Sequence, residues 1–372
     1  MAKNTIQIAD KPTLDAVKAL LENKRNTSVI SCEFAAEVSR LITPAILVST
    51  LPYLNGFYKG AVVVYNNEIH ILGQFGTGSE CTEHYKFDGS SWSEVSALPY
   101  SFDNGAAVVY NNEIHILGSY TSNCGTKHYK FDGSSWSEVS TLPYSFNSGA
   151  AVVYNNEIHI LGGNSDANDT TAKHYKFDGS SWSEVSTLPK RIGNGAAVVY
   201  NNEIHYLKGG YNFENGRAHY KFDGSKWISV STLPYSYCAA AVVYNNEIHI
   251  LGQFGNDSTQ KHYKFDGSSW SEVSTLPHPF SGAAVVYNNE IHILGGTVSN
   301  DEDRKKHCKF LRQIYKQNEP MYLPKDTKIY SAYELMSISN CSLETTHLVV
   351  TEDGNVSFAV LTDGAKSTIT LC

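Results

Sequence analysis

Histidine is the residue of this chain whose type and spacing could most readily do chemistry, because imidazole is a common metal ligand and general base. The chain contains fourteen histidines. Twelve of them occupy two repeated positions, represented by His70 and His84, which each recur five more times. A residue that returns in every repeat is typical of a structural hydrogen bond rather than of one catalytic centre. We therefore expect these histidines to belong to the scaffold, and we predict no catalytic residue, no metal site and no cofactor.

The repeats that carry the histidines are marked by the hexapeptide Tyr-Asn-Asn-Glu-Ile-His. It begins at Tyr65, Tyr110, Tyr154, Tyr200, Tyr244 and Tyr287, which are 43 to 46 residues apart. A fixed period of this size indicates a repeat architecture. Between the hexapeptides a second block, Tyr-Lys-Phe-Asp-Gly-Ser-Ser-Trp, recurs with small changes, so each unit contains four short segments with strand character. Four strands in each unit are typical of a propeller blade.

One repeat shows how the strands are expected to form. Its first segment is rich in small and β-branched residues and predicts an innermost strand that is buried on both faces. Asn111 and Asn112 tolerate positive φ and predict a two-residue hairpin turn. Trp136 precedes the fourth strand, and Pro143 ends it. The four strands are expected at residues 105–110, 113–118, 128–131 and 137–142.

The pattern of Gly, Tyr and Trp in each unit resembles that of the kelch-repeat family. The resemblance rests on glycine doublets that close the second strand, as at Gly162-Gly163 and Gly295-Gly296, on a Tyr before the next turn and on a Trp after it. It covers about residues 46–310, although only the third and sixth units keep the doublet where the family has it. The resemblance implies a β-propeller.

The number of blades can be predicted from the two ends of the repeat region. The constant Trp occurs only five times, so the sixth unit lacks its own fourth strand. Residues 48–52 match residues 139–143 and predict an N-terminal strand that completes the last blade. We therefore expect an all-β, six-bladed kelch-type propeller at residues 44–310, preceded by a helical leader at residues 1–43. A small C-terminal β-hairpin anchor is expected at residues 311–372.

The six units differ from one another mainly on one expected face of the ring. The Asn-Asn and Asp-Gly turns hardly change, whereas the loops after the second strand differ in length and charge. Loops on a rigid frame are where binding residues usually lie. Aromatic rings with Asn and Asp partners suit sugars or protein surfaces. The residues predicted to form this ligand-binding face are Phe75, Tyr120, Arg191, Tyr211, Phe213, Arg217, Phe254 and Arg304. The repeated Pro-Tyr-Ser-Phe rings are expected instead to cap the core between blades.

Composition excludes several other classes of protein. The net charge is −8, and no basic stripe is interleaved with aromatic residues, so we predict no nucleic-acid binding. No segment approaches the roughly 20 apolar residues that span a bilayer, and no secretory signal is recognised at the N-terminus. The seven cysteines are scattered, which predicts free thiols in a reducing cytoplasm rather than a disulfide framework or a zinc site.

The leader points to a function for the whole chain. Residues 6–23 resemble the leader of virion or tail-fibre proteins in phages of Gram-positive bacteria. This resemblance implies a phage virion structural or adhesive protein, assembled in the bacterial cytoplasm. Its terminal segments would bind other virion proteins, and the propeller would bind a host-surface glycan or protein non-covalently. Assembly into a homo-oligomer is compatible with the sequence.

Two other functions remain open at this level. The first is a cytoplasmic kelch-type adaptor that recruits protein partners. The second is a glycan-active enzyme, since the kelch family includes the copper enzyme galactose oxidase and the turn from Asp132 to Trp136 partly resembles that of sialidases. Sialidases bind a carboxylate through three arginines, and Arg191, Arg217 and Arg304 lie on the expected variable face. The chain does not show a matching tyrosine nucleophile or copper ligand set.

Overall fold

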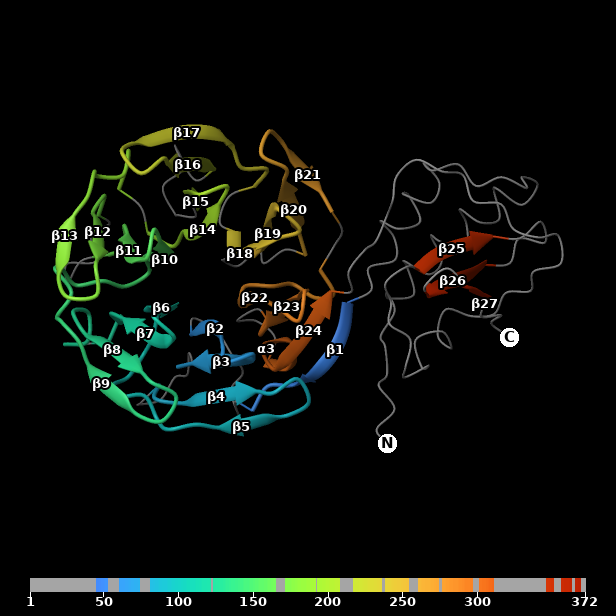
Figure 1. Cartoon of the computed structure of the whole chain (residues 1–372), viewed down its shortest axis with the longest axis horizontal. Helices are drawn as coiled ribbons and strands as arrows, with labels where there is room; N and C mark the ends of the chain where they lie inside the picture. The colour runs from blue at the N-terminus through green and yellow to red at the C-terminus, as the bar shows by residue number, and fades with distance from the viewer. Residues whose placement is uncertain are drawn as a thin grey trace. The chain divides into compact units, whose positions relative to one another are not determined.

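The repeats form a ring of six four-stranded sheets, and three C-terminal strands form a separate small sheet (Figure 1). Residues 49–308 are one compact unit, and a second unit gathers residues 1–48 and 309–372. The computed structural model describes residues 45–52, 60–73, 81–121, 123–164, 171–191, 193–207, 217–235, 238–253, 260–273, 276–296, 301–310, 346–350, 356–362 and 365–368. The expected helical leader lies outside these residues.

The first two strands of each blade are joined by the Asn-Asn turn. The first strands are β2 (Ala61–Tyr65), β6 (Ala106–Tyr110), β10 (Ala150–Tyr154), β14 (Ala196–Tyr200), β18 (Cys238–Tyr244) and β22 (Ala283–Tyr287). The second strands are β3 (Glu68–Leu72), β7 (Glu113–Leu117), β11 (Glu157–Leu161), β15 (Glu203–Leu207), β19 (Glu247–Gln253) and β23 (Glu290–Leu294). In the second blade, Asn111 and Asn112 have φ values of 49° and 59°, as expected for a tight hairpin between twisted strands.

The outer two strands of each blade contain the second repeated histidine and, in five blades, the repeated tryptophan. The third strands are β4 (His84–Phe87), β8 (His128–Phe131), β12 (His174–Phe177), β16 (Ala218–Phe222), β20 (His262–Phe265) and β24 (Lys306–Phe310). The fourth strands are β5 (Trp92–Glu94), β9 (Trp136–Glu138), β13 (Trp182–Glu184), β17 (Trp227–Thr232), β21 (Trp270–Glu272) and, in the last blade, β1 (Ala45–Thr50). A one-turn helix, α3 (Asp301–Arg304), precedes β24.

The ring closes through its N-terminal strand, as the sequence predicts. The order of strands in the last blade is β1-β24-β23-β22, so the first strand of the chain completes the sheet made by the last repeat. The backbone N–H of Leu51 also donates to the carbonyl of Lys305 at 2.7 Å. The C-terminal sheet contains β25 (Thr346–Val350), β26 (Val356–Thr362) and β27 (Ala365–Thr368) in that order. The fold is therefore an all-β, six-bladed propeller.

Two details of the blade differ from the expectation. The innermost strand β6 is buried on one face and only half-buried on the other, where Ala107 and Val109 pack against the first blade, whereas β7 is buried at four of its five positions. The reason is that β6 has a hydrogen-bonded partner on one edge only, while β7 lies between two strands. The fourth strand is also shorter than residues 137–142, although Val139 and Leu142 still donate backbone hydrogen bonds to the segment of the third strand.

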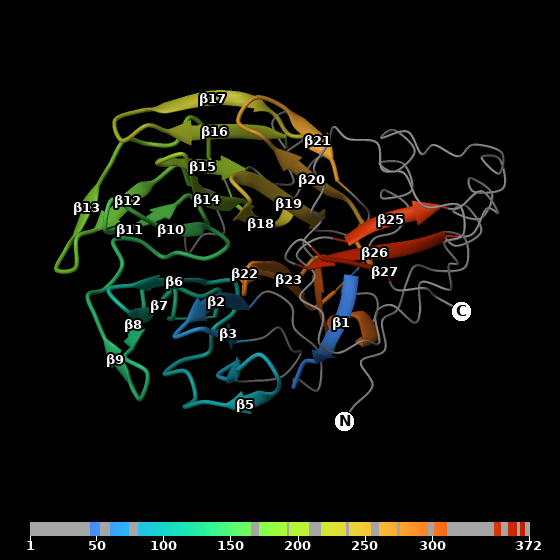
Figure 2. The ribbon, with the colours of Figure 1, turned by 45° about the vertical axis from the view of Figure 1, so that its right-hand side comes forward.

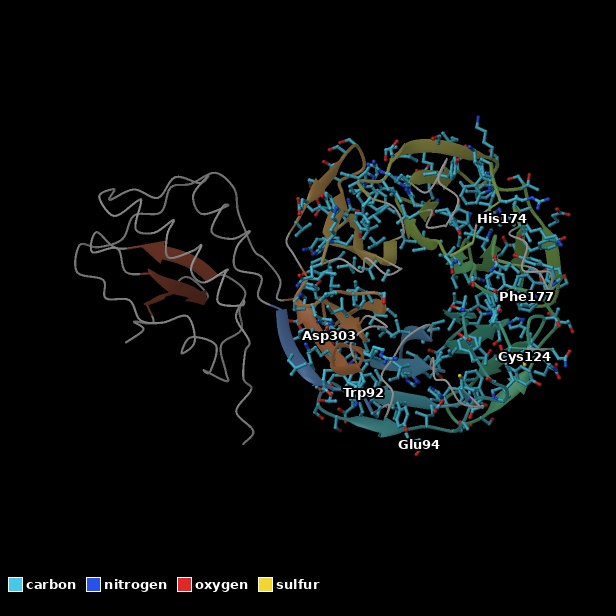
Figure 3. All side chains as sticks on the ribbon, turned by 180° about the vertical axis from the view of Figure 1, so that it is seen from behind. Trp92, Glu94, Cys124, His174, Phe177 and Asp303 are labelled. Carbon is cyan, nitrogen blue, oxygen red and sulfur yellow. The ribbon has the colours of Figure 1, made fainter. Side chains whose placement is uncertain are left out.

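The hydrophobic core lies between blades rather than within them. Val63 and Phe102, from the first blade and the loop after it, form one cluster with Ile114, Ile116 and Phe131 of the second blade. Similar clusters join the second and third, the third and fourth, and the fourth and fifth blades. Side chains fill the spaces between blades all around the ring (Figure 3). Each blade thus depends on its neighbours for burial of both faces.

The constant turns also lock neighbouring blades together. Gly133 has a φ of 103°, and a Cβ at this position would lie 3.1 Å from the phenolic oxygen of Tyr65 in the preceding blade. Gly179 and Tyr110 show the same geometry one blade further on. The Asp-Gly turn is therefore constrained by packing, in addition to the backbone conformation that it requires.

A serine hydroxyl supports the seam of the ring. Ser49 Oγ lies 3.0 Å from Nδ1 of His307 and accepts a 2.9 Å hydrogen bond from Nε1 of Trp92 in the first blade. Ser231, at the equivalent position, makes the same two kinds of contact with His219 and Trp270. Where the outer strand is shorter, the equivalent Ser140 Oγ has no hydrogen-bond partner.

We predict that Ser49→Ala lowers the free energy of unfolding of the full chain by roughly 1–3 kcal/mol, because it removes the hydrogen bonds that the Ser49 hydroxyl makes with Trp92 and His307. The matched control is Ser140→Ala, for which a change within about 0.5 kcal/mol is expected. Urea denaturation of the two variants measures the difference. Equal losses in the two variants would show that the hydrogen bonds of Ser49 do not support the seam.

Candidate functional site

A hydrogen-bonded pair of histidines is buried in every blade. In the first blade, Nδ1 of His70 on β3 lies 2.8 Å from Nε2 of His84 on β4. The same contact, at 2.7 to 2.8 Å, joins His115 to His128, His159 to His174, His205 to His219, His249 to His262, and His292 to His307. None of these twelve residues is more than 5% exposed. The pairs therefore join the second strand of a blade to the third.

Each histidine pair lies between a surface ion pair and the next blade. Nε2 of His70 is 3.9 Å from a carboxylate oxygen of Glu68, and Lys86 Nζ is 3.0 Å from the other oxygen. On the opposite side, the ring of His84 meets the edge of Phe131 with centroids 5.1 Å apart. The same arrangement of Glu, Lys and two histidines recurs in the second to fifth blades.

Burial keeps the histidines neutral. Loss of hydration lowers the pKa of His70 to about 4, although the nearby Glu68 carboxylate acts in the opposite direction. Burial and the neighbouring His70 lower the pKa of His84 to about 3. The pKa values of the equivalent histidines in the second to fifth blades shift in the same direction. Because the rings are buried and bonded to each other, the predicted scaffold role of these histidines is confirmed.

The described residues do not assemble a metal centre. Within the part of the chain that the structure describes, no group of three or more His, Cys, Asp or Glu side chains is placed to hold a metal ion. Two imidazoles that use facing nitrogens for a mutual hydrogen bond do not form a ligand set either.

The loops of the variable face contact one another. In the second blade, the loop after β7 reaches the loop before β6, and the backbone N–H of Tyr120 donates to the carbonyl of Asp103 at 2.7 Å. Ser119 Oγ donates to the carbonyl of Ser101 and accepts from the N–H of Asp103. Thr121 Oγ1 donates to the same Ser101 carbonyl. The two kinds of loop therefore belong to one face, as predicted, and buried Ser119 fixes them together.

Four of the eight predicted face residues lie in described segments. Tyr120 is 53% exposed, although its backbone is held by the contacts above. Arg191 is exposed in the loop before β14. Arg217 has a structural contact, because its Nε donates to the carbonyl of Leu233 at 2.6 Å. Arg304 is half-buried at the end of α3.

The other four predicted residues, Phe75, Tyr211, Phe213 and Phe254, lie outside the described residues. The binding role of all eight residues stays a prediction. The repeated Pro-Tyr-Ser-Phe rings are now placed in the core, as expected. Phe102 is fully buried, and buried Tyr100 donates its hydroxyl hydrogen to the carbonyl of Gly118 at 3.1 Å.

Sequence reasoning missed a row of polar residues on this face. Asn104, Ser148 and Asn194 each stand two residues before the innermost strand of their blade. Their φ values are 56°, 55° and 53°. The N–H of Ser148 donates to the carbonyl of Asn104 at 2.7 Å, and the N–H of Asn194 donates to the carbonyl of Ser148 at 2.6 Å. We call these three residues the polar arc. The signal available in the sequence was a small polar residue placed directly before Gly at the same point of four repeats, of which Ser281 in the last repeat is not among the residues at positive φ.

Comparison with known proteins supports the fold alone. No family model matches the chain, and no curated protein matches it. A solved structure described as "Structure of YjhT" is similar, with a TM-score of 0.60 at 16% sequence identity. The match covers 74% of this chain and 99% of that one. At this identity the likeness shows that the two proteins share a propeller architecture. The class of protein that the fold and the comparisons define is therefore a six-bladed β-propeller.

The buried histidines predict a specific dependence of stability on pH. In the unfolded chain each histidine has a pKa near 6.5, whereas in the folded chain the pKa values are lowered. Stability from these groups is therefore complete above pH 6.5. It is lost as the pH falls toward about 4, because the unfolded state then binds more protons, on the order of ten in all. The pKa of Asp88 is lowered to about 2 by hydrogen bonds from Ser90 and Ser91, so protonation of Asp88 affects stability only at lower pH.

Thermal unfolding measured at intervals from pH 7.5 to pH 4.5 checks this prediction. The unfolding temperature should fall steadily below pH 6.5. A double variant of one pair, His115→Gln with His128→Gln, should unfold at a lower temperature at pH 7.5 but show a shallower decline. An unfolding temperature that is constant between pH 7.5 and pH 5 would contradict the neutral, buried state of the pairs.

Proposed function

We propose that the chain is a non-enzymatic binding protein whose propeller presents one variable loop face to a partner. The observation that carries the proposal is the exposed ring of Tyr120 on loops that are otherwise tied down. Ser119, which is 2% exposed, holds both of these loops through its hydroxyl. A rigid, exposed aromatic ring is typical of binding surfaces, because little conformational entropy is lost when a partner covers it.

The two faces of the ring differ in what fixes them. On the face of the Asn-Asn turns, Gly133 packs against Tyr65 of the preceding blade, and Lys86 pairs with Glu68 of its own blade. Most changes there would therefore disturb a contact between blades or between two strands of one blade. On the opposite face, the loop sequences differ from blade to blade while the frame beneath them is kept. The turns of the first face therefore stay the same from blade to blade for a structural reason. On the second face, the loop residues can change without disturbing the strands beneath them.

The kelch-type pattern and the leader extend this proposal to a biological setting. We assign the chain to a phage virion as a structural or adhesive component, assembled in the bacterial cytoplasm. The N- and C-terminal segments would bind other virion proteins, and the propeller would bind a host-surface glycan or protein. The resemblance of residues 6–23 to phage leaders supports this setting. In the described residues no helix is long and apolar enough to cross a membrane.

The alternative that shares most with this proposal is a cytoplasmic kelch-type adaptor. It would use the same face of the propeller to bind an intracellular protein. A glycan-active enzyme is favoured less by the geometry. Arg217, one of the three arginines that a sialidase-like site would use, donates its Nε to the carbonyl of Leu233. The histidines that could act as bases are buried.

The location of the protein tests the proposal. Mass spectrometry of virions purified from a lysogen that carries this gene should find the chain in stoichiometric amount, and immunogold labelling should place it on the particle surface. A parallel sample of the host cytoplasm, freed of particles, is the control. Detection in the cytoplasm alone would contradict the virion assignment and favour the adaptor.

A further inference from the structure

We propose that Tyr120 and the polar arc form one site for an uncharged carbohydrate. This inference rests on the proposed binding function and names the ligand class and the site. The arc is a continuous structure, because backbone hydrogen bonds join Asn104 to Ser148 and Ser148 to Asn194. Tyr120 is bonded to Asp103, the residue directly before Asn104. An aromatic ring therefore stands at the start of a row of polar side chains.

The arc lies across three neighbouring blades at the inner side of the ring. Asn104, Ser148 and Asn194 lead into β6, β10 and β14, which are drawn as neighbours around the centre in both views of the ribbon (Figures 1 and 2). The Cα atoms of neighbouring inner strands approach within 8 Å. The spacing of the blades therefore sets the spacing of the three polar residues. Their positions depend on the strands of the propeller as well as on its loops.

The side chains of the arc match the hydrogen-bonding needs of sugar hydroxyl groups. An amide offers both donors and an acceptor, and the Ser148 hydroxyl, which donates its hydrogen to Oδ1 of Asn147 at 3.2 Å, offers an acceptor. Asn194 is exposed, while Asn104 and Ser148 are half-buried. All three are held at positive φ by the backbone bonds between blades, so little entropy is lost on binding. The apolar C–H face of a sugar ring can pack on the Tyr120 ring.

The chemistry of the arc favours an uncharged ligand. None of its three side chains is ionisable, and the nearest acidic residue in the chain, Asp103, would repel an anionic group. Arg191 is exposed three residues before Asn194, but the proposal does not require it. A sialylated or sulfated glycan would depend on this arginine, whereas a neutral glycan would not.

A glycan fits this surface better than a protein partner does. Protein interfaces depend on several apolar or aromatic anchors that pack together. Among the described residues, Tyr120 and Leu47 are the large apolar side chains that are clearly exposed, and Leu47 lies on the outer strand β1. Within the described part of this face, one exposed ring lies beside two amides and a hydroxyl, an arrangement that suits one or two sugar units.

The experiment uses the full chain on an array of immobilised oligosaccharides. The array carries neutral hexose and N-acetylhexosamine chains beside sialylated and sulfated ones, and the same protein is tested on whole host cells. We expect binding to a neutral chain. Tyr120→Ala and Asn194→Gly should each weaken it roughly tenfold, since each removes one contact. Glycine at position 194 keeps the positive φ that the backbone needs.

Matched controls separate loss of a contact from loss of structure. Asn112→Gly removes an exposed amide at positive φ from the opposite face, and Leu47→Ala removes the other exposed apolar side chain. Both controls should bind as the unchanged protein does. Thermal unfolding of every variant should agree with that of the unchanged protein to within a few degrees.

The outcomes distinguish this site from the broader function. If the unchanged chain binds host cells or a glycan but Tyr120→Ala and Asn194→Gly bind equally well, the site is wrong and the binding function stands. Binding only to sialylated or sulfated chains, lost in Arg191→Ala, overturns the assignment of a neutral ligand. Binding to cells that survives removal of surface glycans and is abolished by protease treatment assigns a protein partner instead. Absence of binding to both cells and array contradicts the proposed function itself.

Discussion

Burial of both faces of each blade against its neighbours is the constraint on which the rest of the structure depends. A four-stranded blade cannot bury its two faces alone, so six blades must meet in a closed ring. The clusters that join Val63 to Ile114, and the ring of Tyr65 that lies over Gly133, are contacts of this kind. Closure by β1 satisfies the same need at the seam, where Ser49 bonds to His307 and Trp92. Residues that serve these contacts recur in every repeat because every repeat has the same two neighbours.

The same constraint explains why so many histidines are buried and do not form a surface site. A neutral imidazole has one donor and one acceptor nitrogen, so one histidine of each pair can donate to the other between strands without a charge. In return, the ring of His84 fills space against Phe131 of the next blade. The Glu68 and Lys86 pair closes the arrangement at the surface. The repeated histidines, which could be taken for catalytic residues in the sequence, are therefore part of the core.

Most of the fold could be predicted from the sequence because it follows from local signals that repeat. The Asn111-Asn112 turn, the third strand at residues 128–131 and the closing strand near residues 48–52 were all found where their patterns indicate. Burial of the innermost strand was overestimated, since composition does not show that β6 has a free edge. The candidate site was predicted only in part. Tyr120 could be chosen by its type, but the arc of Asn104, Ser148 and Asn194 arises from bonds between blades, and sequence spacing within one repeat does not show such bonds.

The central claim is that partners bind the variable face and leave the opposite face uncovered. Hydrogen–deuterium exchange of the full chain, with and without purified surface polysaccharide of the host, tests it most directly. The account predicts slower exchange at residues 101–104, 119–127, 145–148 and 190–194, with no change at the Asn-Asn turns. Protection at the turns around Asn66, Asn111 and Asn155, with none on the loops, would contradict it.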